Sequence, residues 1–330
     1  WDAPLSKVEG VQPSPAPVAV APRGNMTTTS SRVPEAVSIS AELLPLITSR
    51  AAMRVHSAFD RSLNVVLEAP APAWLPLGMI TLAHEGVGNL PNGILVRGEA
   101  ALRGLALMGG RALLDHGRLM LDGARIDLSG APAWDPSLDR VCARGRSAGW
   151  KGRWASAWHA LTRAVGEAPA SPLWGMAAER VDRLADALER RALGEAVDAA
   201  RQLVGLGPGL TPSGDDLLVG VLVAMHCGRA SAGPVDGFVS AFGAEIRAMS
   251  RRTTDVSRVF LEWAARGRAT QRLRDVVEAV VMPQGEGRLG GALDAALRVG
   301  STSGADGLLG LLMGLRLWTH EREEDHANAA

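Results

Sequence analysis

Residues 205–216 read GLGPGLTPSGDD, and residues 217–225 continue the chain as LLVGVLVAM. Four glycines and two prolines fall within the first ten of these residues, which predicts a tight, rigid loop with some positive φ angles. Ser213 is the expected N-cap of a helix, and Asp216 completes a pair like that of a capping box. Because the following run is apolar on every side, this stretch predicts a buried helix over residues 214–227.

The start of this helix is suited to binding as well as to packing. A buried helix leaves its first N–H groups pointing into the protein, and these groups suit a carboxylate or a phosphate at the positive end of the helix dipole. Asp215 and Asp216 are costly beside an apolar helix unless they meet a metal, a cation or a donor on a substrate. The simpler alternative is a connecting loop that ends in a cap, but a cap would use only one of the two acids. We therefore expect a ligand site here, for a small anionic substrate.

A second stretch repeats the first. Residues 303–315, SGADGLLGLLMGL, align without gaps with residues 213–225, SGDDLLVGVLVAM, and Asp306 takes the place of the second aspartate. Gly220 and Gly310 occupy equivalent positions, and small residues on both helices allow the two backbones to approach closely. The alternative is that Ser-Gly-x-Asp is a favourable helix start that arose twice. The repeat favours two loop–helix units that bring their loops near each other.

A third motif lies between the two in the chain. Residues 251–257 read RRTTDVS, which predicts a capped helix start with hydroxyl groups and two arginines. Arginine pairs bidentately with carboxylate or phosphate groups. Taken alone, the simpler interpretation of this motif is a solvated helix end.

The fold class follows from a change of pattern along the chain. We expect a disordered extension over residues 1–40, a β-rich region over 45–135, a helical region over 136–320 and a disordered tail over 321–330. This is an α+β arrangement, with an antiparallel sheet or small barrel before the helices. The expected strands lie within Arg54–Glu68, Met79–Ala83, Gly93–Arg97 and Arg118–Leu128. Helical spacing of apolar residues covers 137–165 and 177–204, and further helices are expected at 214–227, 236–250, 255–266, 270–281, 288–298 and 305–319.

Composition excludes several classes of function. The chain of 330 residues is 47% apolar and carries 35 basic and 35 acidic residues, so it has no basic excess for nucleic acid. The longest uncharged apolar run, residues 217–225, is about half of what a membrane span needs. Its two cysteines form no disulfide framework or metal motif, which favours a cytoplasmic protein. His56, in the strand region, is more typical of a satisfied structural histidine than of a catalyst.

These motifs carry a resemblance to a known family. The run GLGPGLTPSGDDLLVGVL, the pair Thr253-Thr254 with Ser257, and SGADGLLGLLMGL resemble the AllH-type family, as do HSAF at 56–59 and PNG at 91–93. The resemblance covers about residues 45–320. It implies a subunit of an oxamate carbamoyltransferase, acting with AllF-like and AllG-like subunits in anaerobic allantoin breakdown. The implied reaction moves a carbamoyl group between oxalurate and phosphate, giving oxamate and carbamoyl phosphate.

The motifs and the resemblance together define the expected site. The expected catalytic residues are Asp215, Asp216 and Asp306, which orient an amide or move a proton. No cofactor is specified and no metal ligand is assigned, although Mg²⁺ beside the aspartates stays open. The expected substrate-binding residues are Gly207, Gly209, Thr211, Ser213, Gly214, Thr253, Thr254, Ser301, Thr302, Ser303, Gly304, His56 and Asn92.

Two other functions remain open at this point. The chain could be a non-catalytic subunit whose loops only bind a ligand or brace partner subunits. It could also be a small-molecule kinase of ribokinase type, because residues 213–216, SGDD, are similar to the anion-hole loop of those enzymes. The chain before that loop lacks the regular βα alternation which the kinase fold requires.

Overall fold

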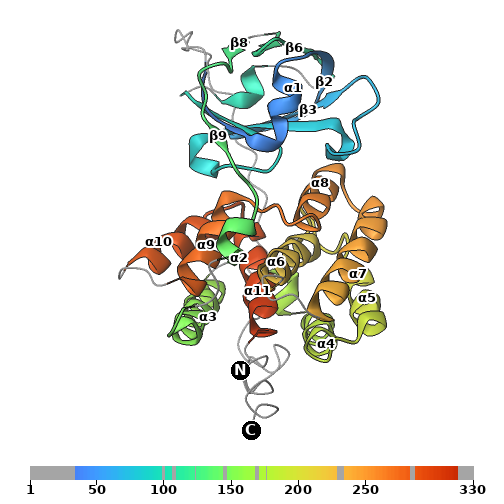
Figure 1. Cartoon of the computed structure of the whole chain (residues 1–330), viewed down its shortest axis with the longest axis vertical. Coiled ribbons are helices and arrows are strands. Elements are labelled where there is room, and N and C mark those ends of the chain that lie inside the picture. Colours follow the sequence, from blue (N-terminus) through green and yellow to red (C-terminus); the bar gives the residue numbers. More distant parts are fainter. Residues whose placement is uncertain are drawn as a thin grey trace, which may run out of the picture. The chain divides into compact units, whose positions relative to one another are not determined.

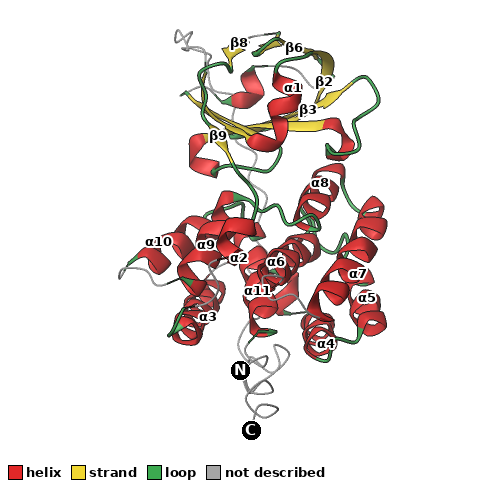
Figure 2. Cartoon of the chain, in the orientation of Figure 1, coloured by secondary structure: helices red, strands yellow, loops and turns green. Residues whose placement is uncertain are grey.

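The computed structural model describes residues 34–318, apart from gaps at 99–100, 106–108, 123, 144–146, 168–170, 176, 229–233 and 283–286. The chain divides between Trp134 and Asp135 into a sheet unit and a helical unit (Figures 1 and 2). The predicted fold class, a β-rich region followed by a mainly helical region, is confirmed.

The sheet unit is built on one curled sheet. Within the described residues the strands follow the order β8-β7-β6-β2-β3-β4-β5-β1-β9. Neighbours are antiparallel except for the parallel pairs β4–β5 and β1–β9. The strands are β1 (Glu35–Ser40), β2 (Arg50–Ala58), β3 (Ser62–Leu67), β4 (Met79–His84), β5 (Gly93–Arg97), β6 (Arg111–Asp115), β7 (Arg118–Leu121), β8 (Ala124–Asp127) and β9 (Ala133–Trp134).

The central strands of this sheet are buried on both faces. β3 reads SLNVVL and β4 reads MITLAH, and the inner residues of both are buried. Near-continuous apolar runs of this kind are typical of strands that are covered on both sides. In β2 the register against β3 shifts between Val55 and Ser57, so a bulge falls at His56. A bulge redirects a side chain, and this one affects the first residue of the HSAF motif.

The N-terminal limit of the fold differs from the prediction. Residues 1–40 were expected to be a disordered extension, but residues 35–40 form β1, which pairs with β5. The expectation is wrong for these six residues because Ala36 and Ile39 bury their side chains in the core of the sheet. The rest of that segment, residues 1–33, and the expected tail over 321–330 lie outside the described residues.

Six of the predicted helices agree with the helical unit to within three residues at each end, and the two longer helical segments do not. Residues 137–165 divide into α2 and α3, and residues 177–204 divide into α4 and α5, with Arg191 at φ 53° between the latter two. The described helices are α2 (Asp139–Ala143), α3 (Trp150–Glu167), α4 (Ala178–Glu189), α5 (Leu193–Arg201), α6 (Ser213–Gly228), α7 (Pro234–Met249), α8 (Asp255–Ala264), α9 (Gln271–Val281), α10 (Arg288–Leu297) and α11 (Ser303–Arg316).

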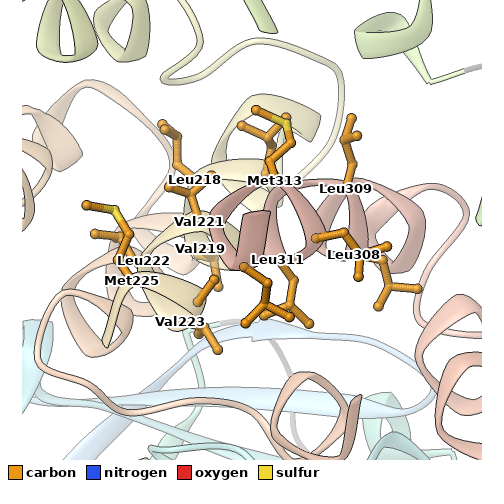
Figure 3. Close-up of a cluster of buried hydrophobic side chains, with 14 of the residues drawn as sticks. Leu218, Val219, Val221, Leu222, Val223, Met225, Leu308, Leu309, Leu311 and Met313 are labelled. Atoms are coloured by element: carbon orange, nitrogen blue, oxygen red, sulfur yellow. The ribbon is translucent and has the colours of Figure 1, made fainter. Parts of the chain in front are cut away.

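Helices α6 and α11 form the centre of the helical unit. Figure 1 shows α3, α9 and α10 on one side of this pair and α4, α5, α7 and α8 on the other. Apolar side chains from both helices, among them Leu218, Leu222, Leu308 and Leu311, are fully buried in one cluster (Figure 3). Burying a leucine side chain contributes about 1.5–3 kcal/mol, so this pair supplies much of the stability of the unit.

Glycine makes the contact between the two central helices possible. A Cβ on Gly220 would lie 2.0 Å from the carbonyl oxygen of Gly307, and a Cβ on Gly310 would lie 1.9 Å from that of Leu217. Both distances are far below any van der Waals contact. The prediction that Gly220 and Gly310 let the two backbones pack closely is confirmed.

None of the helices in the described part of the chain is both long and apolar enough to cross a membrane.

Candidate functional site

The two repeated helix starts meet in the helical unit. The Thr211 Oγ1 atom lies 3.0 Å from Ser303 Oγ, and Ser213 Oγ lies 3.5 Å from Thr302 Oγ1. Each of these hydrogen bonds joins the first motif to the second. The structure thus brings together segments that lie ninety residues apart in the chain.

The second residue of each helix must be glycine. A Cβ on Gly214 would lie 2.0 Å from the carbonyl oxygen of Leu203, just after α5. A Cβ on Gly304 would lie 2.1 Å from the carbonyl oxygen of Ala296, within α10. Each helix start is therefore pressed against the end of the helix that precedes it, and the two motifs share one local architecture.

This close approach changes the expected role of the backbone. The N–H of Gly214 donates to the carbonyl of Leu206 at 2.9 Å, and the N–H of Gly304 donates to that of Val299 at 2.9 Å. The expectation that these N–H groups bind an anion is therefore wrong for both glycines. The carbonyls of the preceding turns already satisfy them, as buried helix ends require.

The first loop has the backbone that its glycines predict. Gly205, Gly207 and Gly209 have φ angles of 74°, 114° and 92°. At Gly207 a Cβ would also lie 2.8 Å from the backbone nitrogen of Ser213, so the loop folds tightly over the helix start. Ser213 itself is the first residue of α6 and faces Thr302, which differs from the N-cap role expected for it.

Asp215 holds the first loop and the third motif together. The N–H of Gly205 donates to Asp215 Oδ1 at 2.9 Å, and the hydroxyl of Thr253 donates to Asp215 Oδ2. Burial raises the pKa of Asp215, while these hydrogen bonds and the hydroxyl of Ser257 lower it. Both carboxylate oxygens thus have partners within the protein.

The third motif is part of the same cluster. Thr254 caps α8, because its Oγ1 accepts the N–H of Ser257 at 3.1 Å. The same hydroxyl donates to the carbonyl of Leu210 in the first loop at 2.5 Å. The capped helix start is confirmed. The solvated helix end describes Arg251 and Arg252, which are exposed, but not the two threonines, since Thr253 and Thr254 are both bonded to the first motif.

Asp216 and Asp306 carry the carboxylate oxygens of this cluster that make no hydrogen bond of normal geometry, although hydroxyl groups lie near both side chains. Asp306 is 0% exposed, and neither of its carboxylate oxygens makes a hydrogen bond within the described residues; the same holds for the buried Oδ2 of Asp216. Unpaired buried carboxylates are strongly unfavourable, so these oxygens require either a proton or a donor from a ligand.

Burial determines the protonation of these two groups. It raises the pKa of Asp216 well above the usual range, and the nearby carboxylates of Asp306 and Asp215 raise it further. The hydroxyls of Ser303 and Thr211 act in the opposite direction. Burial also raises the pKa of Asp306, which the hydroxyls of Ser171, Ser213 and Thr302 lower.

Ser171 is a residue of this site that sequence reasoning missed. It is 3% exposed, and it caps the short helix η6 (Pro172–Trp174) by accepting the N–H of Leu173 at 3.2 Å. Its hydroxyl also faces Asp306. The one signal in the sequence is the Ser-Pro pair, which is typical of a helix start but does not reveal a contact with Asp306, 135 residues further along the chain.

The remaining expected residues are not among those that the structure joins in this cluster. Ser301 is exposed and lies next to Gly300, whose φ angle is 62°. His56 is on β2 and Asn92 immediately precedes β5, so both belong to the sheet unit. The described residues hold no group of three or more His, Cys, Asp or Glu side chains that could bind a metal ion, and we assign no metal to the aspartates.

Comparison with known proteins agrees with this arrangement of motifs. No solved structure matches the chain. Residues 35–133 match the family model described as the AllH family N-terminal domain, which corresponds to the sheet unit. Residues 203–315 match the model described as oxamate carbamoyltransferase subunit AllH, which spans all three loop motifs. The two ranges cover most of the chain, and the protein therefore belongs to the AllH family.

Proposed function

We propose that this chain is a subunit of an oxamate carbamoyltransferase that transfers a carbamoyl group between oxalurate and phosphate. The products in one direction are oxamate and carbamoyl phosphate, as part of allantoin breakdown. The family description supports the enzyme class. The observation that carries the proposal is the buried, unpartnered oxygens of Asp216 and Asp306 where the two helix starts meet.

The unpartnered atoms favour a ligand that brings hydrogen-bond donors. An ionised carboxylate accepts hydrogen bonds and repels an anion, and a protonated one still offers its other oxygen as an acceptor. The first N–H groups of both helices at Gly214 and Gly304 are already used. A carbamoyl or amide NH₂ group supplies two donors and no charge. Oxalurate, oxamate and carbamoyl phosphate all carry such a group, so we place their NH₂ end at Asp216 and Asp306.

The anionic end of the substrate needs different partners. The hydroxyls of Thr211, Ser213, Thr302 and Ser303 can donate to carboxylate or phosphate oxygens, and they lie at the N-terminal ends of α6 and α11. This arrangement would orient the substrate with its amide toward the aspartates. The sequence predicted that backbone N–H groups at the helix starts bind the anion; in this proposal side-chain hydroxyls are the donors instead.

The proposed chemistry requires one proton to move. A phosphate oxygen attacks the carbamoyl carbon of oxalurate, the C–N bond to the oxamate part breaks, and the departing nitrogen gains a proton. Asp216 is suited to donate that proton, because burial raises its pKa and keeps it protonated at a higher pH than an ordinary aspartate. In the reverse direction the same carboxylate accepts the proton from oxamate.

The family description is that of a subunit, so we propose a hetero-oligomer with AllF-like and AllG-like chains. The test is to reconstitute that complex and to measure carbamoyl phosphate formed from oxalurate and phosphate. Asp216→Asn should abolish turnover, whereas Asp294→Asn, an exposed aspartate on α10, should leave it unchanged. Full turnover of the Asp216→Asn complex would remove Asp216 from the reaction.

One observation favours a non-catalytic role as the second candidate. Asp306 is completely buried, which also suits a subunit that holds a ligand or a proton without performing the transfer. The isolated subunit would then bind oxamate, and the Asp216→Asn complex would still turn over. A kinase of ribokinase type has no comparable support, because α6 follows the helix α5 rather than a strand.

A further inference from the structure

A line of buried polar side chains crosses the centre of the sheet unit. Ser57 on β2, Asn64 on β3, Thr81 on β4 and Asn92 before β5 are between 1% and 7% exposed. Ser57 is paired with Asn64, and Asn64 with Thr81, in the register of the sheet. Polar side chains are costly at the centre of a small sheet, and apolar residues would stabilise it better. The line ends at His56, whose position is set by the bulge in β2.

The hydrogen bonds along this line all run from donor to acceptor in one direction, beginning with the side chain of Asn92. The Nδ2 atom of Asn92 lies 3.2 Å from the carbonyl oxygen of Met79, which can only accept a hydrogen bond. This contact fixes the orientation of the amide, so Nδ2 is also the atom that meets Thr81 Oγ1 at 3.0 Å. Thr81 therefore accepts a hydrogen bond from Asn92, and its own proton is left to be donated.

The direction continues through the next two side chains. Thr81 donates to Asn64 Oδ1 at 2.7 Å, which turns the Nδ2 atom of Asn64 toward Ser57. Asn64 Nδ2 then donates to Ser57 Oγ at 2.8 Å. Ser57 has one hydroxyl proton, and its other side-chain neighbour at hydrogen-bond distance is the Nδ1 atom of His56, 3.1 Å away. That proton is accordingly directed at His56.

We infer that Asn64, Thr81 and Asn92 act as positioning residues that direct the Ser57 hydroxyl at Nδ1 of His56 and so select the ring tautomer that carries its proton on Nε2. Because Ser57 donates to Nδ1, that nitrogen carries no proton, and the ring proton resides on Nε2. Nε2 therefore acts as a donor, so any partner of that atom, whether from the protein or from a ligand, offers an acceptor such as a carbonyl, carboxylate or phosphate oxygen. If every hydrogen bond in the line ran the other way, the amide oxygen of Asn92 would face the carbonyl oxygen of Met79 and repel it. This repulsion favours the observed direction, and with it the Nε2–H tautomer, by at least about tenfold. The inference goes beyond the proposed function and does not depend on carbamoyl transfer.

The experiment is to record the ¹⁵N chemical shifts of the His56 ring by NMR in the full-length chain. The wild type should show an unprotonated Nδ1 and a protonated Nε2. Asn64→Asp should reverse this assignment, because a carboxylate accepts from both Thr81 and Ser57. Ser57 then becomes the acceptor for a proton on Nδ1.

A second pair of variants keeps the test independent of how Asn64→Asp folds. Thr81→Val removes the hydroxyl and should give a mixture of tautomers, whereas Thr81→Ser keeps the hydroxyl and should retain the wild-type spectrum. A wild-type ring protonated on Nδ1 would overturn the inference. An unchanged His56 spectrum in a folded Thr81→Val variant would overturn it as well. Neither result would bear on the role of Asp216 in turnover.

Discussion

The replacement of Gly310 by alanine adds one methyl group at the closest point between α6 and α11. Its Cβ would lie 1.9 Å from the carbonyl oxygen of Leu217 and 3.0 Å from the Leu217 Cα. Gly307 provides a matched control on the same helix, since a Cβ there would meet its nearest atoms at 3.6 and 3.7 Å, which are ordinary contacts. Both substitutions change the helix propensity equally. Their difference therefore isolates the contact between the two helices.

The size of the effect follows from these distances. To restore a contact of 3.4 Å, α11 would have to move away from α6 by about 1.5 Å. Overpacking of a core typically costs about 1–3 kcal/mol, and such a shift also separates buried side chains that now pack together, which adds about 2 kcal/mol. The gain in helix propensity offsets about 1 kcal/mol. We expect Gly310→Ala to lower the free energy of unfolding by about 2–4 kcal/mol, and Gly307→Ala to raise it by up to about 1 kcal/mol.

The assay is urea unfolding followed by circular dichroism, with a thermal melt as a second measurement. For a unit of this size the expected loss corresponds to a fall in Tm of roughly 4–16 °C. Moving α11 would also break the contact between Thr211 and Ser303, so turnover of the reconstituted complex should fall in the same variant. Equal unfolding midpoints for Gly310→Ala and Gly307→Ala would refute the argument that glycine permits the contact.

Three further predictions concern the carboxylates. Asp216→Asn should abolish turnover with little change in the circular dichroism spectrum, because an amide cannot donate the required proton; retained turnover would count against it. Burial raises the pKa of Asp306, so the folded protein binds this proton more tightly than the unfolded chain does. The resulting stabilisation is fully present below the unfolded pKa of about 3.9 and is lost as the pH rises through the folded-state pKa. In urea titrations, the free energy of unfolding of the wild type minus that of Asp306→Asn should thus decrease between pH 4 and pH 7. A difference that stays constant with pH would contradict this. Thr253→Val should cost about 1–3 kcal/mol in the same assay by removing a donor to buried Asp215, whereas Thr253→Ser should cost much less.

Much of the helical unit could be predicted from local pattern. The loop of Gly205–Asp216 and its near-copy at residues 303–315 carry their own helix starts, glycines and apolar faces, so the periodicity locates α6 and α11. The equivalent glycines at 220 and 310 predicted that the two helices touch, which the structure confirms. These features are encoded in residues close together in the chain.

The parts that could not be predicted depend on contacts between distant residues. The N–H groups of Gly214 and Gly304 are satisfied by carbonyls of preceding turns, which depends on how each loop folds back. Ser171 approaches Asp306 from a segment without a recognisable motif, and Thr253 donates to Asp215 across 38 residues. The sequence indicated the three motifs that meet in this cluster but not Ser171, and only the structure identifies the atoms that remain unpaired.

The balance of donors and acceptors in the site leads to the central claim. Asp216 and Asp306 offer buried acceptors, so the site should prefer a ligand with an NH₂ group over an equally shaped anion. Oxamate and oxalate differ at one position, where oxamate carries NH₂ and oxalate carries a charged oxygen. Isothermal titration calorimetry of the reconstituted complex with the two compounds therefore tests the claim most directly. We predict that oxamate binds at least about tenfold more tightly and that Asp306→Asn reduces this preference. Equal or tighter binding of oxalate would contradict the account.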